Sequence, residues 1–200
     1  MGTKTTTLAM AVAFWGLLGA VPFRIQGATL RVTSTADSGA GSLRAALASA
    51  NNGDTIDATG LAGTITLTSG QLVIEDSVVI FGPGAAVLTV SGNSAFRVFE
   101  VTGTEVTIHD LRIANGASAD SGGGMHVTGT PGNTTVLHGC IVADNSATAN
   151  GGGIRNSGGA TLDIRGCVVS GNTAGSSGGG IHNDKDRKST RLNSSHRIRS

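Results

Sequence analysis

The stretch GGGIRNSGGATLDIRGCVVSGNTA, residues 151–174, decides the fold because its opening triple glycine recurs along the chain. Triple glycines begin at Gly122, Gly151 and Gly178, so the spacings are 29 and 27 residues. Glycine-rich segments can hold phosphate or calcium, and they can also mark the corners of a stacked fold. A fixed period in the range of about 20 to 50 residues favours a stacked repeat architecture.

A second element recurs with the same period. HGCIVADNSA begins at His138, RGCVVSGNTA begins at Arg165, and HDLRIANGAS from His109 matches them one unit earlier. Apolar residues alternate over short runs that Gly, Asn and Ser separate, as expected for short strands. None of these runs has the roughly 10 periodic residues that a helix needs. We therefore expect an all-β chain that folds as a right-handed parallel β-helix, with three short strands in each coil of 27–29 residues.

The segment SLRAALASAN, residues 42–51, is different, because its apolar residues follow the i, i+3, i+4, i+7 spacing of a helix. Ser42 or Ser38 can cap its start, and Asn52-Gly53 can end it. The open first edge of a β-helix would pair with other chains, and this helix can cover it. We expect residues 29–53 to form an N-terminal cap of a strand and a helix, followed by a β-helix over residues 54–185.

The N-terminus has the pattern of a secretory signal peptide, with Lys4 ahead of the uncharged apolar run Leu8–Val21. This run is short for a membrane span, which needs about 20 residues. Residues 1–28 are therefore expected to be a signal peptide that directs the chain out of the cytoplasm, the alternative being an uncleaved N-terminal anchor.

The segment Asp186–Ser200 is basic, polar and without a period, and its DRKSTRLNSSH stretch resembles a translated sequencing adapter. We expect it to be a non-native tail, which would make the β-helix a C-terminally truncated fragment; a genuine basic tail is the alternative. The segment holds five of the 14 Lys and Arg residues and one of the 13 acids, so without it the formal net charge changes from +1 to −3. That balance gives no electrostatic reason to expect nucleic acid as a partner.

The period also aligns the only two cysteines, Cys140 and Cys167, in successive units. Stacked coils would bring their Cα atoms to about 5 Å, which allows either a disulfide or a ladder of buried thiols. Leu111 occupies the same position one unit earlier and favours the thiol ladder. A zinc site would need a correctly spaced His pair, which the sequence lacks.

Asparagines and glycines align in the same way and are expected to be structural. Asn145 with Asn172, and Asn156 with Asn183, are expected to hydrogen-bond along the coil axis. The glycines are expected to form corners with positive φ and close backbone contacts. They are Gly122, Gly123, Gly124, Gly151, Gly152, Gly153, Gly178, Gly179 and Gly180.

Two polar columns follow from the alignment. His109, His138 and Arg165 share one position, while His126, Arg155 and His182 share a second, outward position. The second column is a candidate contact strip for an anion or a glycan, and a plain solvated face is the alternative.

No catalytic or cofactor motif is found. The triple glycines lack the Lys-Ser or Lys-Thr of a phosphate loop and the Asp of the calcium-binding nonapeptide. No spacing ties a Ser to a His, and the acidic residues between Glu75 and Asp163 form no recurring column. We therefore expect no catalytic, cofactor or metal site in this part of the chain.

The combination of RVTSTADSGAGSLRAALASANNGDTI with GGGI-x-N and x-L-x-I-x-x-C-x-V-S-G-N-T-A units resembles bacterial secreted β-helix repeat proteins of the CSLREA type. These are similar to polymorphic outer-membrane protein repeats. The literal CSLREA string is absent, and SLRAAL at Ser42 stands in its place. The resemblance covers residues 29–185 and is specific for the fold rather than for an activity.

The resemblance implies a secreted or cell-surface scaffold, adhesin-like and monomeric. Its expected partner is a glycan or the surface of a host or neighbouring cell, in bacteria at the outer membrane. The alternative function is a carbohydrate-active β-helix enzyme, a polysaccharide lyase or hydrolase, with its site in a C-terminal part beyond residue 185.

Overall fold

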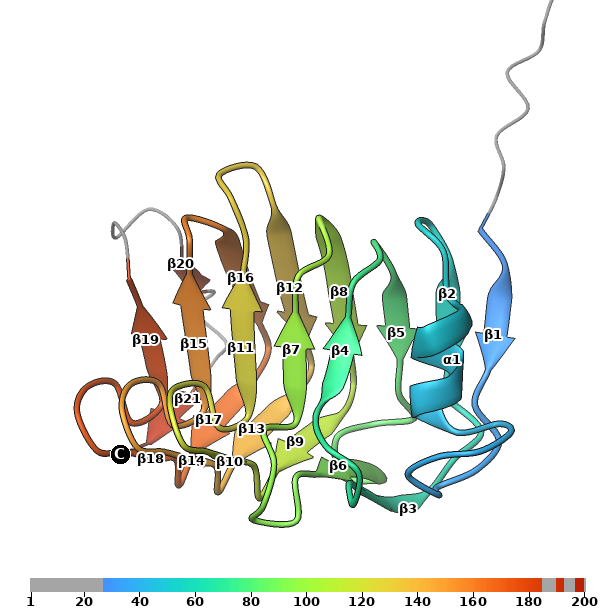
Figure 1. The fold of residues 1–200 in the computed structure, drawn as a ribbon, viewed down its shortest axis with the longest axis horizontal. Coiled ribbons are helices and arrows are strands. Elements are labelled where there is room, and N and C mark those ends of the chain that lie inside the picture. Colours follow the sequence, from blue (N-terminus) through green and yellow to red (C-terminus); the bar gives the residue numbers. More distant parts are fainter. Residues whose placement is uncertain (1–26, 185–189, 193–196, 200) are drawn as a thin grey trace, which may run out of the picture.

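The computed structural model describes residues 27–184 and the strands Thr190–Leu192 and Arg197–Arg199. The chain is a parallel β-solenoid of about six turns with one small helix near its N-terminus, as Figure 1 shows. The predicted fold class is therefore confirmed. The predicted signal peptide lies outside the described residues, except for its last two positions.

Three parallel sheets run along the solenoid. Sheet 1 contains, in spatial order, β1 (Thr29–Arg31), β2 (Thr55–Asp57), β5 (Val79–Phe81), β8 (Glu105–His109), β12 (Thr134–His138), β16 (Thr161–Arg165) and β20 (Thr190–Leu192). Sheet 2 contains β3 (Gly63–Thr66), β6 (Leu88–Ser91), β9 (Arg112–Ala114), β13 (Ile141–Ala143), β17 (Val168–Ser170) and β21 (Arg197–Arg199). Sheet 3 contains β4 (Leu72–Ile74), β7 (Phe99–Val101), β11 (Met125–Thr128), β15 (Ile154–Ser157) and β19 (Ile181–Asn183).

A fourth, shorter ladder joins β10 (Ala117–Ser118), β14 (Ser146–Ala147) and β18 (Thr173–Ala174) in the later coils. The sequence did not predict it, because its strands are only two residues long. In Figure 1 the strands of sheet 3 stand side by side at the front, and sheet 2 runs along the bottom. Each complete coil thus adds one strand to each of the three sheets, so residues one period apart lie next to each other in neighbouring strands.

The core is a stack of inward side chains from consecutive coils. In β11 the side chains of Met125 and Val127 are buried, while those of His126 and Thr128 face outward. Fully burying one such apolar side chain stabilises the fold by about 1.5–3 kcal/mol. Phe99 is the one aromatic residue in this core among the residues that the structure describes. Val, Ile and Leu supply most of the rest, in keeping with the low aromatic content.

The triple glycines lie at corners that lead into sheet 3. Gly151 has a φ of +62°, in the left-handed region that suits glycine. A Cβ atom on Gly152 would lie 2.0 Å from the carbonyl oxygen of Thr173 in the next coil. Successive corners therefore stack backbone against backbone, which leaves no room for a side chain.

The predicted helix is confirmed as α1 (Leu43–Ser49), with Leu43 and Ala46 buried. The hydroxyl of Ser42 accepts a hydrogen bond from the Ala45 N–H at 3.1 Å and caps the helix. The helix packs beside β4, at the first edge of sheet 3, where no earlier strand pairs (Figure 1). It therefore takes the place of a strand at that edge.

Asp37 ties this cap to the solenoid. Its carboxylate accepts hydrogen bonds from Arg44 Nη2 at 2.6 Å and from the backbone N–H of Ser69 at 2.9 Å. Burial of the carboxylate opposes ionisation, but the hydrogen bonds from Ser69, Arg44 and Thr68 outweigh it and lower the pKa of Asp37 strongly. The sequence did not single out this residue.

The predicted tail contributes backbone to the last coil, since β20 pairs with β16 and β21 with β17. This pairing does not bear on the origin of the segment, which stays a prediction, as do the domain boundaries. Within the described ranges, no helix has the length and apolar character required to cross a membrane.

Candidate functional site

Four polar side chains form one outward column on sheet 3, which we call the polar column. Glu100 of β7, His126 of β11, Arg155 of β15 and His182 of β19 are register partners in successive coils. The alignment of His126, Arg155 and His182 follows the sequence period, while their role as a ligand strip stays a prediction. Glu100, one of the acidic residues without a recurring column in the sequence, extends this column by one coil.

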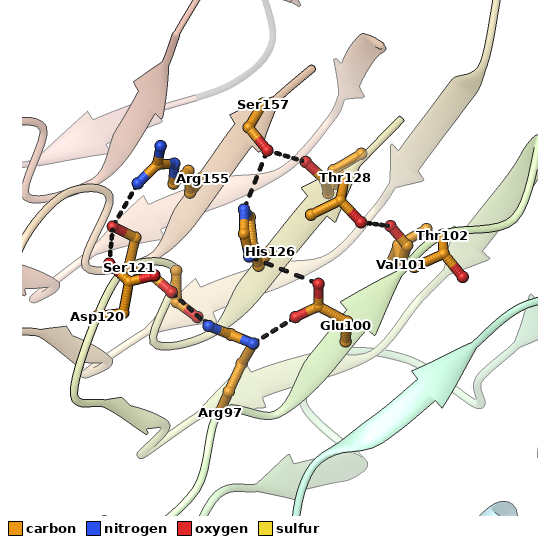
Figure 2. Close-up of polar contacts among 12 residues, drawn as sticks. Arg97, Glu100, Val101, Thr102, Asp120, Ser121, His126, Thr128, Arg155 and Ser157 are labelled. Atoms are coloured by element: carbon orange, nitrogen blue, oxygen red, sulfur yellow. Dashed lines mark hydrogen bonds and ion pairs between the residues drawn. The ribbon is translucent and has the colours of Figure 1, made fainter. Parts of the chain in front are cut away.

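Arg97 holds the Glu100 carboxylate in place. Its Nη1 donates to Glu100 Oε2 and, at 2.9 Å, to Gln71 Oε1. Its Nη2 donates to the Ser121 carbonyl oxygen at 2.8 Å, and its Nε donates to the Gly122 carbonyl oxygen at 3.0 Å. Figure 2 shows the guanidinium bridging Glu100 and the corner before β11. Because one guanidinium donates both to the carboxylate and to the backbone of the corner, the orientations of the Arg97 and Glu100 side chains are fixed.

Glu100 is an ionised carboxylate in this setting. Burial opposes its ionisation, but the hydrogen bond from His126 and the positive charge of Arg97 lower its pKa below the ordinary value of 4.5. A glycosidase acid needs the opposite shift, since it must carry a proton near neutral pH. Glu100 is therefore unsuited to act as a general acid.

His126 lies between Glu100 and Ser157. Its Nδ1 is 3.5 Å from Glu100 Oε1, and its Nε2 is 3.1 Å from the Ser157 hydroxyl oxygen (Figure 2). No spacing in the sequence pointed to this contact between a Ser and a His, which forms across neighbouring coils. Ser157 lies two residues beyond Arg155, the register partner of His126, so it reaches His126 diagonally across the sheet.

This carboxylate–imidazole–hydroxyl order is that of a serine hydrolase, but the hydroxyl proton is directed elsewhere. The Ser157 hydroxyl donates to the Val127 carbonyl oxygen at 3.2 Å. Thr128 makes the equivalent bond to the Val101 carbonyl oxygen at 3.3 Å, one coil earlier. A hydroxyl has one proton to donate, so the Val127 carbonyl oxygen competes with His126 Nε2 for the proton of Ser157. This competition makes the arrangement a poor match to an activated nucleophile, and the repeat of the hydroxyl-to-carbonyl bond at Thr128 favours a structural ladder.

Arg155 and His182 share one carboxylate further along the column. Arg155 donates to Asp184 Oδ2 at 2.6 Å and to the Ser121 hydroxyl at 2.6 Å. His182 Nε2 is 3.0 Å from Asp184 Oδ1. Asp184 follows directly after β19 and has no counterpart in the repeat alignment of the column. Its position next to His182 becomes apparent only once the strand ends at Asn183.

Charges balance along this face. The cationic Arg97 and Arg155 are each paired with an acid, Glu100 and Asp184 respectively. A paired column offers hydrogen-bonding groups without a strong field of one sign, so it suits hydroxyl-rich neutral molecules better than simple anions. An open hollow of about 280 Å³ lies beside Val73, the register partner of Glu100, and is lined by Arg44, Leu47, Ala48, Leu72, Val73, Glu75 and Asp76.

A second outward column lies on sheet 1, where Phe81, His109, His138 and Arg165 are successive register partners. Alignment of the last three follows the sequence period, and Phe81 adds one coil. Burial and the nearby charge of His138 lower the pKa of His109, against the opposing effect of Asp110.

Cys140 and Cys167 are stacked, buried and free. The Cys140 N–H donates to Cys167 Sγ at 3.3 Å, and Leu111 is buried one coil earlier. The contact with Cys167, together with burial, raises the pKa of the Cys140 thiol well above its usual range. The Cys140 thiol is therefore a poor nucleophile.

The aligned asparagines contact one another along the axis. Asn145 Nδ2 donates to Asn172 Oδ1 at 2.9 Å, and Asn156 Nδ2 donates to Asn183 Oδ1 at 3.2 Å. Asn145 also donates to the Ile113 carbonyl oxygen at 3.1 Å and accepts from the Gly116 N–H at 2.8 Å. These contacts join coils at the corners.

Within the described part of the chain, no three His, Cys, Asp or Glu side chains gather as a metal-binding group. No family model, no curated protein and no solved structure matches this chain.

Proposed function

We propose that this chain is a secreted or cell-surface scaffold that binds a neutral glycan through the polar column of sheet 3, without catalysis in this region. The observation that carries the proposal is the continuous chain of polar contacts from Arg97 through Glu100 and His126 to Ser157. The side chains are held in place by one another, so binding costs little side-chain entropy. Secretion and adhesin-like use rest on the N-terminal pattern and on the resemblance to CSLREA-type β-helix proteins.

The chemistry of the column supports a sugar ligand. Carboxylate, guanidinium and imidazole groups present planar sets of acceptors and donors, and a sugar hydroxyl can serve as both. Pairing leaves no excess of charge on Arg97, Glu100, Arg155 and Asp184, which favours a neutral over an acidic glycan. The hollow next to α1 continues the same face and provides a concave, partly apolar end near Val73.

The second candidate is a carbohydrate-active hydrolase, favoured by the alignment of Glu100, His126 and Ser157. Two features count against it. The Ser157 hydroxyl donates to the Val127 carbonyl oxygen, and the lowered pKa of Glu100 removes the proton that a general acid would supply.

A glycan array probed with the labelled full chain tests the proposal. Arg155→Ala removes a central member of the column, and Arg112→Ala removes an exposed ion pair with Asp144 on sheet 2 as a matched control. Binding of neutral glycans by the wild type and by Arg112→Ala, lost in a folded Arg155→Ala variant, supports it. Equal binding by all three, binding confined to acidic glycans, or no binding would refute it.

A further inference from the structure

The outward column of sheet 1 is a stack of rings. Phe81 and His109 have ring centroids 4.7 Å apart and planes 15° apart, and His109 and His138 have centroids 5.2 Å apart and planes tilted by 50°. Consecutive coils are spaced by the ordinary distance between strands, about 4.8 Å, which sets this ring spacing. The two imidazoles are therefore neighbours because the backbone pairs His109 with His138 in adjacent strands.

Stacking determines which parts of the rings remain accessible. One face of His109 is covered by Phe81 and the other is directed toward His138, so a sugar cannot stack on either face. The rims stay open, and the rim of an imidazole carries its two nitrogens. His138 is exposed and His109 is partly exposed, so these rims face solvent.

The ring nitrogens of these two histidines differ from those on sheet 3. His126 Nε2 contacts Ser157, and His182 Nε2 is paired with Asp184. For His109 and His138, by contrast, the described residues supply only ring contacts and neither a hydrogen bond nor an ion pair to a ring nitrogen. Two neighbouring imidazoles therefore keep their lone pairs available.

We propose that His109 and His138 form a two-imidazole site for a first-row transition-metal ion, such as Ni²⁺, Cu²⁺ or Zn²⁺, on the outer face of sheet 1. The side chains start from directly opposite register positions, and the 50° tilt brings the rings closer together along one side. Rotating an imidazole by 180° about its Cβ–Cγ bond leaves the ring plane unchanged and swaps the two ring edges. A ring nitrogen of each histidine can therefore lie on the side where the rings are closer. Imidazole nitrogen is a preferred ligand of these ions.

Water completes the coordination in this proposal. No third His, Cys, Asp or Glu joins the pair as a metal-binding group among the residues described. The site is therefore an open surface chelate that selects metal by ligand type, with affinity rising from Zn²⁺ or Ni²⁺ to Cu²⁺. Mg²⁺, which requires oxygen ligands, is not expected to bind. This inference is independent of the glycan proposal, which concerns sheet 3.

Calorimetric titration of the full chain with Ni²⁺ tests the site. We expect saturable binding of one ion at this site, with affinity reduced by about tenfold or more in His109→Gln and in His138→Gln. His182→Gln removes a histidine of the other column and should bind as the wild type does. Absence of saturable binding by the wild type, or wild-type affinity in His109→Gln and His138→Gln, would overturn the proposal.

Imidazole NMR provides a second readout that does not depend on folding of the variants. In the wild-type chain, Zn²⁺ should shift the ring nitrogen signals of His109 and His138 and leave those of His126 and His182 unchanged, while Mg²⁺ should shift none. Shifts confined to histidines other than His109 and His138 would contradict the assignment.

Discussion

The side-chain amide of Asn145 donates a hydrogen bond to Oδ1 of Asn172, 2.9 Å away in the next coil. Replacing Asn145 with Ala leaves the Gly116 N–H without its partner in a buried corner, where an unsatisfied group costs about 1–3 kcal/mol. We expect Asn145→Ala to lower the free energy of unfolding by about 3 kcal/mol, because further bonds are also lost. Asn51→Ala, at an exposed position, is the control and should have little effect in urea denaturation. Equal effects of the two substitutions would show that the corner contact is not stabilising.

Close stacking of the corners predicts a steric effect at Gly152. A Cβ atom there would lie 2.0 Å from the Thr173 carbonyl oxygen, so Gly152→Ala should destabilise the solenoid by at least about 2 kcal/mol. Gly60 has open space around its Cβ position, and Gly60→Ala should be neutral or slightly stabilising. Thermal unfolding of both variants measures the difference. A Gly152→Ala variant as stable as Gly60→Ala would mean that the coils are not stacked in this way.

Acid should weaken the fold through Glu100 and Asp37, whose pKa values are both lowered in the folded chain. A carboxyl group with a lowered folded pKa stabilises the fold fully above its unfolded pKa and loses that contribution as the pH falls through the folded value. For Glu100 the loss begins below its ordinary value of 4.5. Urea denaturation at a series of pH values should therefore show falling stability below about pH 4.5.

Glu100→Gln separates the contribution of that residue from the general acid effect. The variant should be less stable than the wild type at neutral pH, and the difference should shrink as the pH falls, since the wild-type carboxylate is then protonated too. A difference that stays constant down to the lowest pH would contradict the pairing of Glu100 with Arg97 and His126.

The cysteines yield a simple chemical prediction. Cys140 and Cys167 are 1% and 0% exposed and are free, so the native chain should not react with a thiol reagent. In denaturant without reductant, two thiols per chain should react. Recovery of no thiols in denaturant would show that the stacked pair is a disulfide.

Much of the fold could be predicted because its period is marked by glycines, which the corners require for their positive φ and close backbone contacts. Gly122, Gly151 and Gly178 mark equivalent corners, and their spacing aligns Cys140 with Cys167 and Asn145 with Asn172. The helix could be predicted from apolar spacing and the Ser42 cap. These signals are local or periodic, so they do not require knowledge of long-range contacts.

Only part of the polar column could be predicted, because only residues that follow the repeat period give such a signal. His126, Arg155 and His182 fall in repeat units that contain a triple glycine, whereas Glu100 belongs to an earlier coil without one. Phe81 lies 28 residues before His109, within the period, but Glu100 lies only 26 residues before His126, so a period of 27–29 residues does not align Glu100 with the column. Arg97, Ser157 and Asp184 act from corner or diagonal positions, which a column alignment does not show.

We propose that the polar column binds a neutral glycan and leaves it chemically unchanged. Incubating the full chain with a panel of neutral oligosaccharides, followed by mass spectrometry of the bound and free fractions, measures both properties in one sample. We expect the wild type to retain oligosaccharide of unchanged mass and Arg155→Ala to lose this retention. Release of shorter or deacylated products, or retention unaffected by Arg155→Ala, would contradict it.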